Sequence, residues 1–358
     1  MAATEIERTR DQGVLGDLGA AEDPTDRTVI EHQHAVAATH QLVVVGRVIE
    51  DRRTLIGQLA QELIDLRLGA DVVATAANKG VLLAMVAIAQ TFVVLTAGID
   101  LSVGTIFVLC NCVASHIVLG TAIETTFGII GVLLTGVACG ALNGLIVIYG
   151  RLQPIVTTIA TGAVFFGIAL LIREQPGGDV NEDLADFLTN QFPGGIPASA
   201  VALLVIVLVI WIPFRRSMLG RVVYAVGSSE PAAYMSGLHI RRAKFAAYCL
   251  SGLLAAIGGL FLTFVTYTGE ASIANANTYT LNSIAAVVLG GVSLFGGRGS
   301  AVGAIFGALI FRTIGDLLFV FDLDPLWQPL FLGIVLLVSV CLGSFRLFRI
   351  RNRLDLFG

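Results

Sequence analysis

Residues Gly80–Gly120 read GVLLAMVAIAQTFVVLTAGIDLSVGTIFVLCNCVASHIVLG, and this stretch decides the fold class. It contains two apolar runs, near 80–98 and 101–119, and Asp100 is its only acidic side chain. An α-helix needs about 20 predominantly apolar residues to cross the roughly 30 Å hydrocarbon core of a bilayer. Both runs approach that length, so we expect two membrane-spanning helices with a very short connection between them.

The composition of the whole chain agrees with a membrane protein. Of its 358 residues, 56% are hydrophobic and 13% are charged, and the mean hydropathy is +0.85. Soluble domains carry about 25% charged residues, so this chain has too few to cover a water-facing surface of its size. We therefore expect membrane lipid around most of it, and nothing in the sequence resembles a basic face that binds nucleic acid.

Seven further apolar runs follow, near 127–149, 155–173, 199–213, 245–267, 279–296, 300–320 and 327–344. Together with the first two they predict an all-α polytopic membrane protein with about nine spans. All five cysteines lie inside apolar runs and have no metal-ligand spacing to a histidine. We interpret them as small apolar core residues and expect no metal site.

Charged residues in the loops predict the orientation. Basic residues crowd the loop 214–244 and the tail 346–358, whereas the loop 174–198 and the short loop 268–278 carry acidic residues. Because cytoplasmic loops are rich in Lys and Arg, the two basic segments are expected inside and the two acidic loops outside.

The segment 1–78 differs from the rest of the chain. It holds 13 acidic residues and 7 arginines, for a net charge of −6, whereas residues 79–358 have a net charge of +2. The nine-span topology would place this arm outside, yet it lacks the apolar region of an export signal. We therefore divide the chain into an atypical acidic arm (1–78), a permease domain (79–345) and a basic cytoplasmic tail (346–358).

Four separated motifs carry a family resemblance. They are AGIDLSVG at 97–104, GALNGLIV at 140–147, EPAAYMSGL at 230–238, which follows GR at 220–221 and AVG at 225–227, and IAAVVLGG at 284–291 with SLFGGRG at 293–299. In this order, over about 80–344, they resemble the ribose-type permeases of ABC importers, within the branched-chain amino acid and sugar permease superfamily.

The resemblance implies a type II-like ABC importer permease with about ten spans in the bacterial inner membrane. It also implies two ATPase subunits inside, an extracytoplasmic sugar-binding protein outside and a second permease copy, identical or related. The chain has no Gly-x-x-x-x-Gly-Lys-Ser/Thr loop and no catalytic triad. We therefore expect no catalytic residues and no bound cofactor here, with ATP and Mg held by the partner ATPase.

Two departures from the family pattern stand out. Where the family has a first span, this chain has the polar end of the arm, which we attribute to a wrong start site or a shifted reading frame rather than to a real loss of the helix. Where many members have an acidic pair before the Ile-Ala-Ala stretch, this chain has Thr280 and Asn282. A different preferred sugar would be one consequence.

The cytoplasmic segment 228–239 is predicted to form a short, partly apolar helix. Pro231 suits the first turn of a helix and Gly237 suits its end. Such a helix can rest on the lipid surface, or it can be the coupling helix that fits a groove on the ATPase. We favour the coupling role and assign to it Glu230, Pro231, Ala232, Ala233, Tyr234, Met235, Ser236 and Gly237.

Polar residues within the spans are the candidates for the translocation path: Gln90, Asp100, Ser102, Asn111, Asn143, Gln153 and Asn282. Neutral hydrogen-bonding groups suit a sugar, whereas an unpaired charge inside the membrane is costly. Each of these residues also has a structural interpretation, as an interhelical hydrogen bond or, for Asp100 and Ser102, as a cap on the next helix.

Two sets of glycines spaced by four predict close helix packing: Gly136, Gly140 and Gly144, and Gly299, Gly303 and Gly307. Arg312 and Asp316, also four apart, are expected to neutralise each other on one helix face, although a gating role is the alternative.

Three other functions remain open. The first is a permease for a nucleoside, an amino acid or another small polar solute. The second is an ion-coupled secondary transporter, which would need intramembrane carboxylates, and only Asp100 and Asp316 qualify. The third is a membrane anchor without transport, which would not need a coupling helix.

Overall fold

The computed structural model describes residues 77–192 and 195–320, together with scattered positions between 327 and 341. All of them belong to one compact unit, residues 69–358. The predicted tail and all but the last two residues of the predicted arm lie outside the described residues, as does half of the predicted span 327–344.

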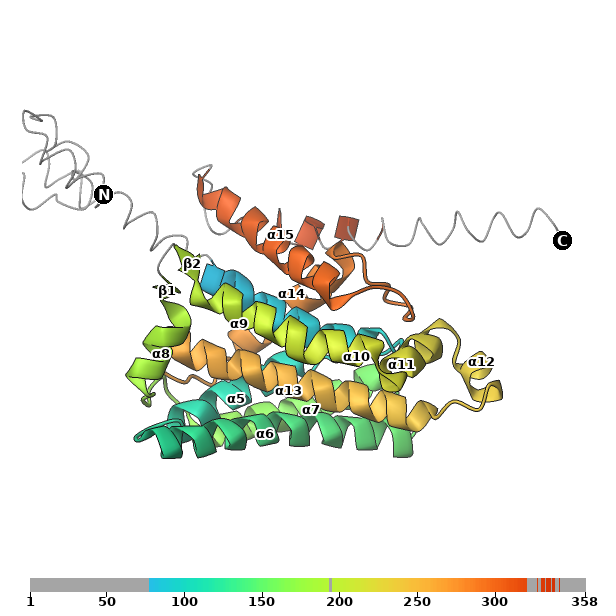
Figure 1. Ribbon diagram of the computed structural model, residues 1–358, viewed down its shortest axis with the longest axis horizontal. Helices are drawn as coiled ribbons and strands as arrows, with labels where there is room; N and C mark the ends of the chain where they lie inside the picture. The colour runs from blue at the N-terminus through green and yellow to red at the C-terminus, as the bar shows by residue number, and fades with distance from the viewer. Residues whose placement is uncertain are drawn as a thin grey trace, which may run out of the picture. The chain divides into compact units, whose positions relative to one another are not determined.

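The described chain is almost entirely helical (Figure 1), as predicted. A helix at Ala77–Val94, called here the first helix, precedes the labelled elements. These are α5 (Val103–Ile117), α6 (Ala122–Tyr149), α7 (Pro154–Ile172), α8 (Glu182–Thr189), β1 (Gln191–Phe192), β2 (Ile196–Pro197), α9 (Ala198–Ile206), the π-helix η1 (Val207–Trp211), α10 (Ile212–Arg216), α11 (Met218–Ser228), α12 (Glu230–Met235), α13 (Ile240–Thr266), α14 (Ile273–Leu289) and α15 (Ala301–Val320).

Each of the first eight predicted runs contains a helix, but the count of nine spans is not confirmed. Within the described residues, five helices are long and apolar enough to cross a membrane: the first helix, α6, α7, the continuous helix 198–216, and α13. One predicted boundary is wrong, because the helix in the predicted run 279–296 ends at Leu289. Gly291, Gly296 and Gly297 adopt positive φ values, which are incompatible with a continuing helix.

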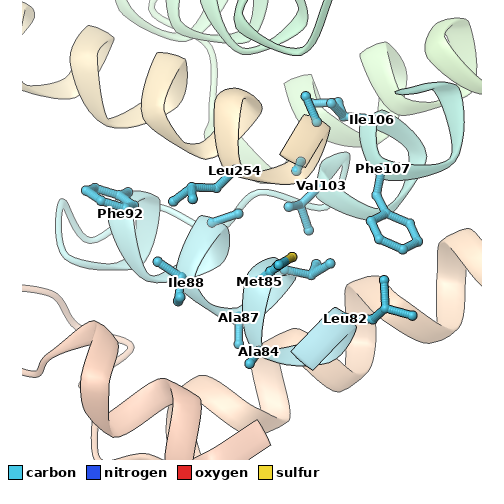
Figure 2. Packing of buried hydrophobic residues seen from close by; sticks show 14 of the residues in the cluster. Leu82, Ala84, Met85, Ala87, Ile88, Phe92, Val103, Ile106, Phe107 and Leu254 are labelled. Carbon is cyan, nitrogen blue, oxygen red and sulfur yellow. The ribbon is translucent and has the colours of Figure 1, made fainter. Parts of the chain in front are cut away.

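The first helix and α5 form the centre of the bundle. Figure 2 shows Met85 and Ile88 of the first helix facing Val103 of α5 and Leu254 of α13. These side chains are almost completely buried. α13 also packs along α6, α7 packs on α5, and α14 packs on both α5 and α15.

The two ends of the bundle carry opposite charges. Exposed Arg215, Arg216, Arg221, Arg241 and Arg242 lie in α10–α13, and we call this the basic end. Exposed Glu182, Asp183, Asp186 and Glu270 lie in α8 and after α13, and we call this the acidic end. In Figure 1, α12 marks the basic end and α8 the acidic end.

A π-helical turn keeps the helix 198–216 continuous. Proline at 213 has no N–H to donate to the preceding turn, and a wide turn is a common response to such a break. Two residues before this proline, Trp211 turns inward and packs edge-on against Phe92 of the first helix, with ring centroids 5.6 Å apart. This helix is longer than the predicted run 199–213.

Candidate functional site

The chain breaks its helical path between the first helix and α5. Ala97 has a positive φ of 62°, and the N–H of Gly98 turns back to the carbonyl of Val93. The 28 residues of α6 extend about 42 Å, whereas the 15 residues of α5 extend about 22 Å. Ser102, the residue before α5, contacts Asn143 well before α6 ends, so α5 begins inside the bundle.

A chain of short hydrogen bonds crosses this break. The hydroxyl and the backbone N–H of Ser102 both donate to Oδ1 of Asp100, over 2.6 and 2.9 Å. The amide of Asn143 on α6 donates to the Ser102 hydroxyl over 2.7 Å, and Thr161 on α7 donates to the oxygen of Asn143 over 2.6 Å. All four residues are buried, so this network fixes α5, α6 and α7 to one another.

Other side chains bind the backbone of the break. The Gln90 amide, in the orientation that satisfies both of its groups, pairs with the N–H and the carbonyl of Asp100, at 3.3 and 2.9 Å. Thr158 of α7 accepts from the N–H of Leu101 over 3.0 Å, and Thr280 of α14 accepts from that of Gly104 over 3.1 Å. The break therefore joins five helices through groups that a regular helix would have satisfied internally.

Several polar atoms beside the break have no hydrogen-bond partner among the described residues. They are Oδ2 of Asp100 and the hydroxyls of Tyr248 and Ser251, two residues of α13. The Tyr248 hydroxyl also lies against Gly98. Buried polar groups of this kind need a partner such as a water molecule, so the break is a polar region inside the otherwise apolar core.

Of the seven predicted path residues, the structure brings together Gln90, Asp100, Ser102 and Asn143. All four are fully buried and contact other protein groups. Asn111 lies elsewhere: its amide donates to Thr263 over 2.9 Å, and its oxygen accepts from the N–H of Glu270. That bond fixes the loop after α13, which is a structural role.

The last two predicted path residues lie apart from the break. Gln153 is exposed at the N-terminus of α7 and makes no capping hydrogen bond. Asn282 is half-buried on α14.

The first predicted glycine strip packs against α13. A Cβ on Gly136 or Gly140 would overlap with the α13 backbone at Gly252 or Tyr248, and Gly144 lies against Phe245. Gly252, which we did not single out from the sequence, is the matching small residue on α13. Its signal was available, because Gly252 and Ala256 are four residues apart.

The second glycine strip is partly wrong. Gly303 and Gly307 pack against Gly290 and Ala286 at the end of α14. Gly299 lies in the turn before α15, because its φ of 127° is incompatible with a helix.

The predicted coupling segment forms α12, which is shorter than 228–239. Ser229 caps it, Pro231 lies in its first turn, and Gly237 follows it with a φ of 72°. Tyr234 and Met235 are 73% and 85% exposed. Ala233, which we assigned to the coupling role, is buried at 4% exposure, so this small side chain packs onto the bundle and does not face outward.

α12 is joined to the bundle by an ion pair of its own and through the contacts of the preceding helix, α11. Glu230 and Lys244 of α13 form an ion pair of 2.7 Å. At the end of α11, Gly227 lies against the carbonyl of Leu95, which accepts from the N–H of Gly297 over 3.1 Å. Nearby, the Tyr224 hydroxyl donates to the carbonyl of Gly299 over 2.7 Å.

The loop 290–300, with its Gly-Gly-Arg-Gly sequence, therefore meets both α11 and the start of the central break. We call this meeting point the junction, and define it by Leu95, Gly227 and Gly297.

The acidic end is held by its own contacts. Tyr267, just after α13, donates from its hydroxyl to the carboxylate of Asp186 on α8. This hydrogen bond, with a smaller contribution from burial, raises the pKa of the Tyr267 phenol above its usual value. Gly177 and Gly269 pair through their backbones, which joins the two predicted outer loops.

Within the described residues, no group of three His, Cys, Asp or Glu side chains is arranged to hold a metal ion. Cys110, Cys112 and Cys139 are buried, free cysteines. Phe107 of α5 is in contact with Tyr279 of α14.

The long apolar helices, the buried polar break and the oppositely charged ends define a polytopic helical membrane protein. Residues 72–340 match the family model described as the branched-chain amino acid transport system permease component. The chain therefore belongs to this permease family, as the four motifs predicted.

Three relatives show the range of this similarity. The ribose import permease protein of Bacillus subtilis is 35% identical over 72% of this chain and 80% of its own length. The fructose import permease protein of Rhizobium meliloti is 34% identical over 73% of this chain and 74% of its own length. The D-allose transport system permease protein of Escherichia coli is 31% identical over 72% of this chain and 78% of its own length. No solved structure matches the chain.

Proposed function

We propose that this chain is the membrane permease subunit of an ATP-driven importer for a monosaccharide, and that α12 couples it to a separate ATPase. The substrate class rests on the names of the relatives, which import ribose, fructose and allose. The oppositely charged ends support an inner-membrane orientation with the basic end in the cytoplasm. An extracytoplasmic sugar-binding protein would then meet the acidic end, and a second permease copy would complete the transporter.

The observation that carries the coupling role is the arrangement of α12. A helix of six residues exposes Tyr234 and Met235 to water, although both are large and apolar. Exposed aromatic and methionine side chains on a rigid support are typical of protein interfaces. The opposite side of the helix, at Ala233, is fixed to the bundle.

The junction offers a route for the movement. α12 follows α11 with only Ser229 between them, and α11 ends at the junction. A displacement of α12 by the ATPase would therefore act on Leu95, at the start of the break. From there the hydrogen bonds of Ser102, Leu101 and Gly104 reach α6, α7 and α14, respectively.

The coupling role can be tested by purification of the complete transporter from membranes. Tyr234→Asp and Met235→Asp should each weaken association with the ATPase by about 30-fold, as expected for an interface residue worth about 2 kcal/mol. Met218→Asp is the matched control, because Met218 is 70% exposed at the same end but lies outside α12. Equal ATPase recovery in all three variants would contradict the coupling role.

The substrate class needs a separate measurement. Proteoliposomes that contain the complete transporter should take up one of ribose, fructose or allose when ATP is supplied, and uptake should require the ATPase. Uptake of only a nucleoside or an amino acid would replace the sugar assignment. Accumulation by the purified chain alone would contradict an ATP-driven importer.

A further inference from the structure

The outward side of α14 carries a group of polar side chains. α14 is capped by Ser272, just after Glu270 of the acidic end, and ends at the loop 290–300 of the junction. Its other side packs on α5 and α15. Ile273 and Leu281 on the outward side are apolar and exposed, but the same side also carries four polar side chains: Asn275, Asn277, Thr278 and the half-buried Asn282. We call these four residues the α14 polar face.

The exposed face of α7 provides the comparison. Its large exposed side chains are apolar throughout and include Ile155, Ile159, Val164 and Leu171. Such a face suits lipid, whereas side-chain amides in hydrocarbon would lose their hydrogen bonds to water. The amides of Asn275, Asn277 and Asn282 have no hydrogen-bond partner among the described residues. The α14 polar face is therefore unsuited to lipid.

A second observation places polar surroundings at the same level. Arg312 and Asp316 of α15 form an ion pair of 2.8 Å, and their side chains are 31% and 40% exposed. The contacts of Gly303 with Gly290 and of Gly307 with Ala286 show that α14 and α15 run antiparallel, which brings Arg312 near the level of Asn282. A partly exposed ion pair in hydrocarbon is costly, so this side of α14 and α15 is better suited to water.

We propose that the α14 polar face borders the water-filled path of the permease and offers its amides to a neutral, hydroxyl-rich solute. The face extends about 10 Å, from Asn275 near the acidic end to Asn282 near the middle of the helix. Its members carry no charge, and amides both donate to and accept from hydroxyl groups. The assignment of the solute rests on the proposed import of a monosaccharide, whereas the contact with water does not.

Cysteine labelling in the complete, membrane-embedded transporter tests the contact with water. The background chain carries Cys249→Ser and Cys341→Ser, because these are the native cysteines that are not buried. The probe is a membrane-impermeant methanethiosulfonate, which reacts with the thiolate form and therefore in water. Thr278→Cys and Asn282→Cys should react at least about 10-fold faster than the α7 controls Ile159→Cys and Val164→Cys.

Addition of the imported monosaccharide should then slow the labelling of Asn282→Cys. Labelling as slow as that of the α7 controls would overturn the proposal, because lipid or protein would then cover the face. Fast labelling that no monosaccharide slows would overturn the assignment of the solute. If Thr278→Cys labels fast in a transporter that imports no sugar, the proposed function fails while the contact with water stands.

Discussion

The α-carbon of Gly227, at the end of α11, lies directly against the main-chain carbonyl of Leu95 at the start of the central break. A Cβ at position 227 would lie 1.9 Å from that carbonyl oxygen. It would also lie 2.4 Å from the main-chain nitrogen of Gly297, so it could not move away on that side. The contact is made by backbone atoms on both sides, so neither side can move a flexible side chain away. Gly227 therefore fixes the distance between the coupling segment and the core.

We expect Gly227→Ala to destabilise the protein by about 1–3 kcal/mol, as overpacked sites do. The measurement is the thermal unfolding of detergent-solubilised protein, in which size-exclusion chromatography determines the fraction that stays folded after heating. Gly167→Ala is the matched control, because a Cβ there meets nothing within 4 Å. Equal melting temperatures for the two variants would contradict the close approach at the junction.

Substitutions at Asp100 separate a structural carboxylate from an ion-coupling one. Asp100→Asn retains an oxygen that accepts from the N–H and the hydroxyl of Ser102, so we expect near-normal folding and uptake. Asp100→Leu leaves both donors buried without an acceptor, and should cost about 2–4 kcal/mol. If Asp100→Asn folds normally but abolishes uptake, the charge itself is needed, and the ion-coupled carrier regains support.

Hydropathy and short motifs predicted much of this molecule. Apolar runs located the helices because lipid-facing and buried positions are both apolar. Proline at 231 and glycine at 237 located α12 because each restricts or permits a particular backbone conformation. Loop 290–300 was missed in part, since its leucine, phenylalanine and valine continue the apolar pattern while its glycines end the helix.

Contacts between distant segments were beyond the reach of the sequence. Asn111 and Asn143 are both asparagines in apolar runs, yet one fixes an outer loop and the other joins the central network. The burial of Ala233 and the match of Gly252 to the first glycine strip also depend on helix pairing. Periodicity indicates which residues share a face, but it does not identify the partner of that face.

The bond between Tyr267 and Asp186 predicts a pH dependence at the acidic end. The pKa of the phenol is raised in the folded protein, so its stabilising effect is complete below the usual tyrosine pKa of about 10 and is lost as the pH rises through the folded-state value. Tyr267→Phe should therefore lower the stability at pH 8 by up to about 1 kcal/mol.

The difference between Tyr267→Phe and the unmodified chain should shrink in melting experiments carried out at increasing pH. Tyr149→Phe serves as the control, since Tyr149 is 65% exposed at the opposite end. A difference that stays constant to high pH would show that the tyrosine hydroxyl is not the group responsible.

The ion pair of Arg312 and Asp316 predicts a non-additive pair of substitutions. Asp316→Asn leaves the guanidinium of Arg312 without its partner, and because the pair is partly exposed we expect a small loss of folded protein in the membrane, worth up to about 1 kcal/mol. The double variant Arg312→Gln with Asp316→Asn removes both charges and should recover most of that loss, which quantitative comparison of folded protein in membranes can measure. If the double variant folds well but transports no solute, the pair takes part in gating; if the losses of the single variants simply add, the two charges do not stabilise each other.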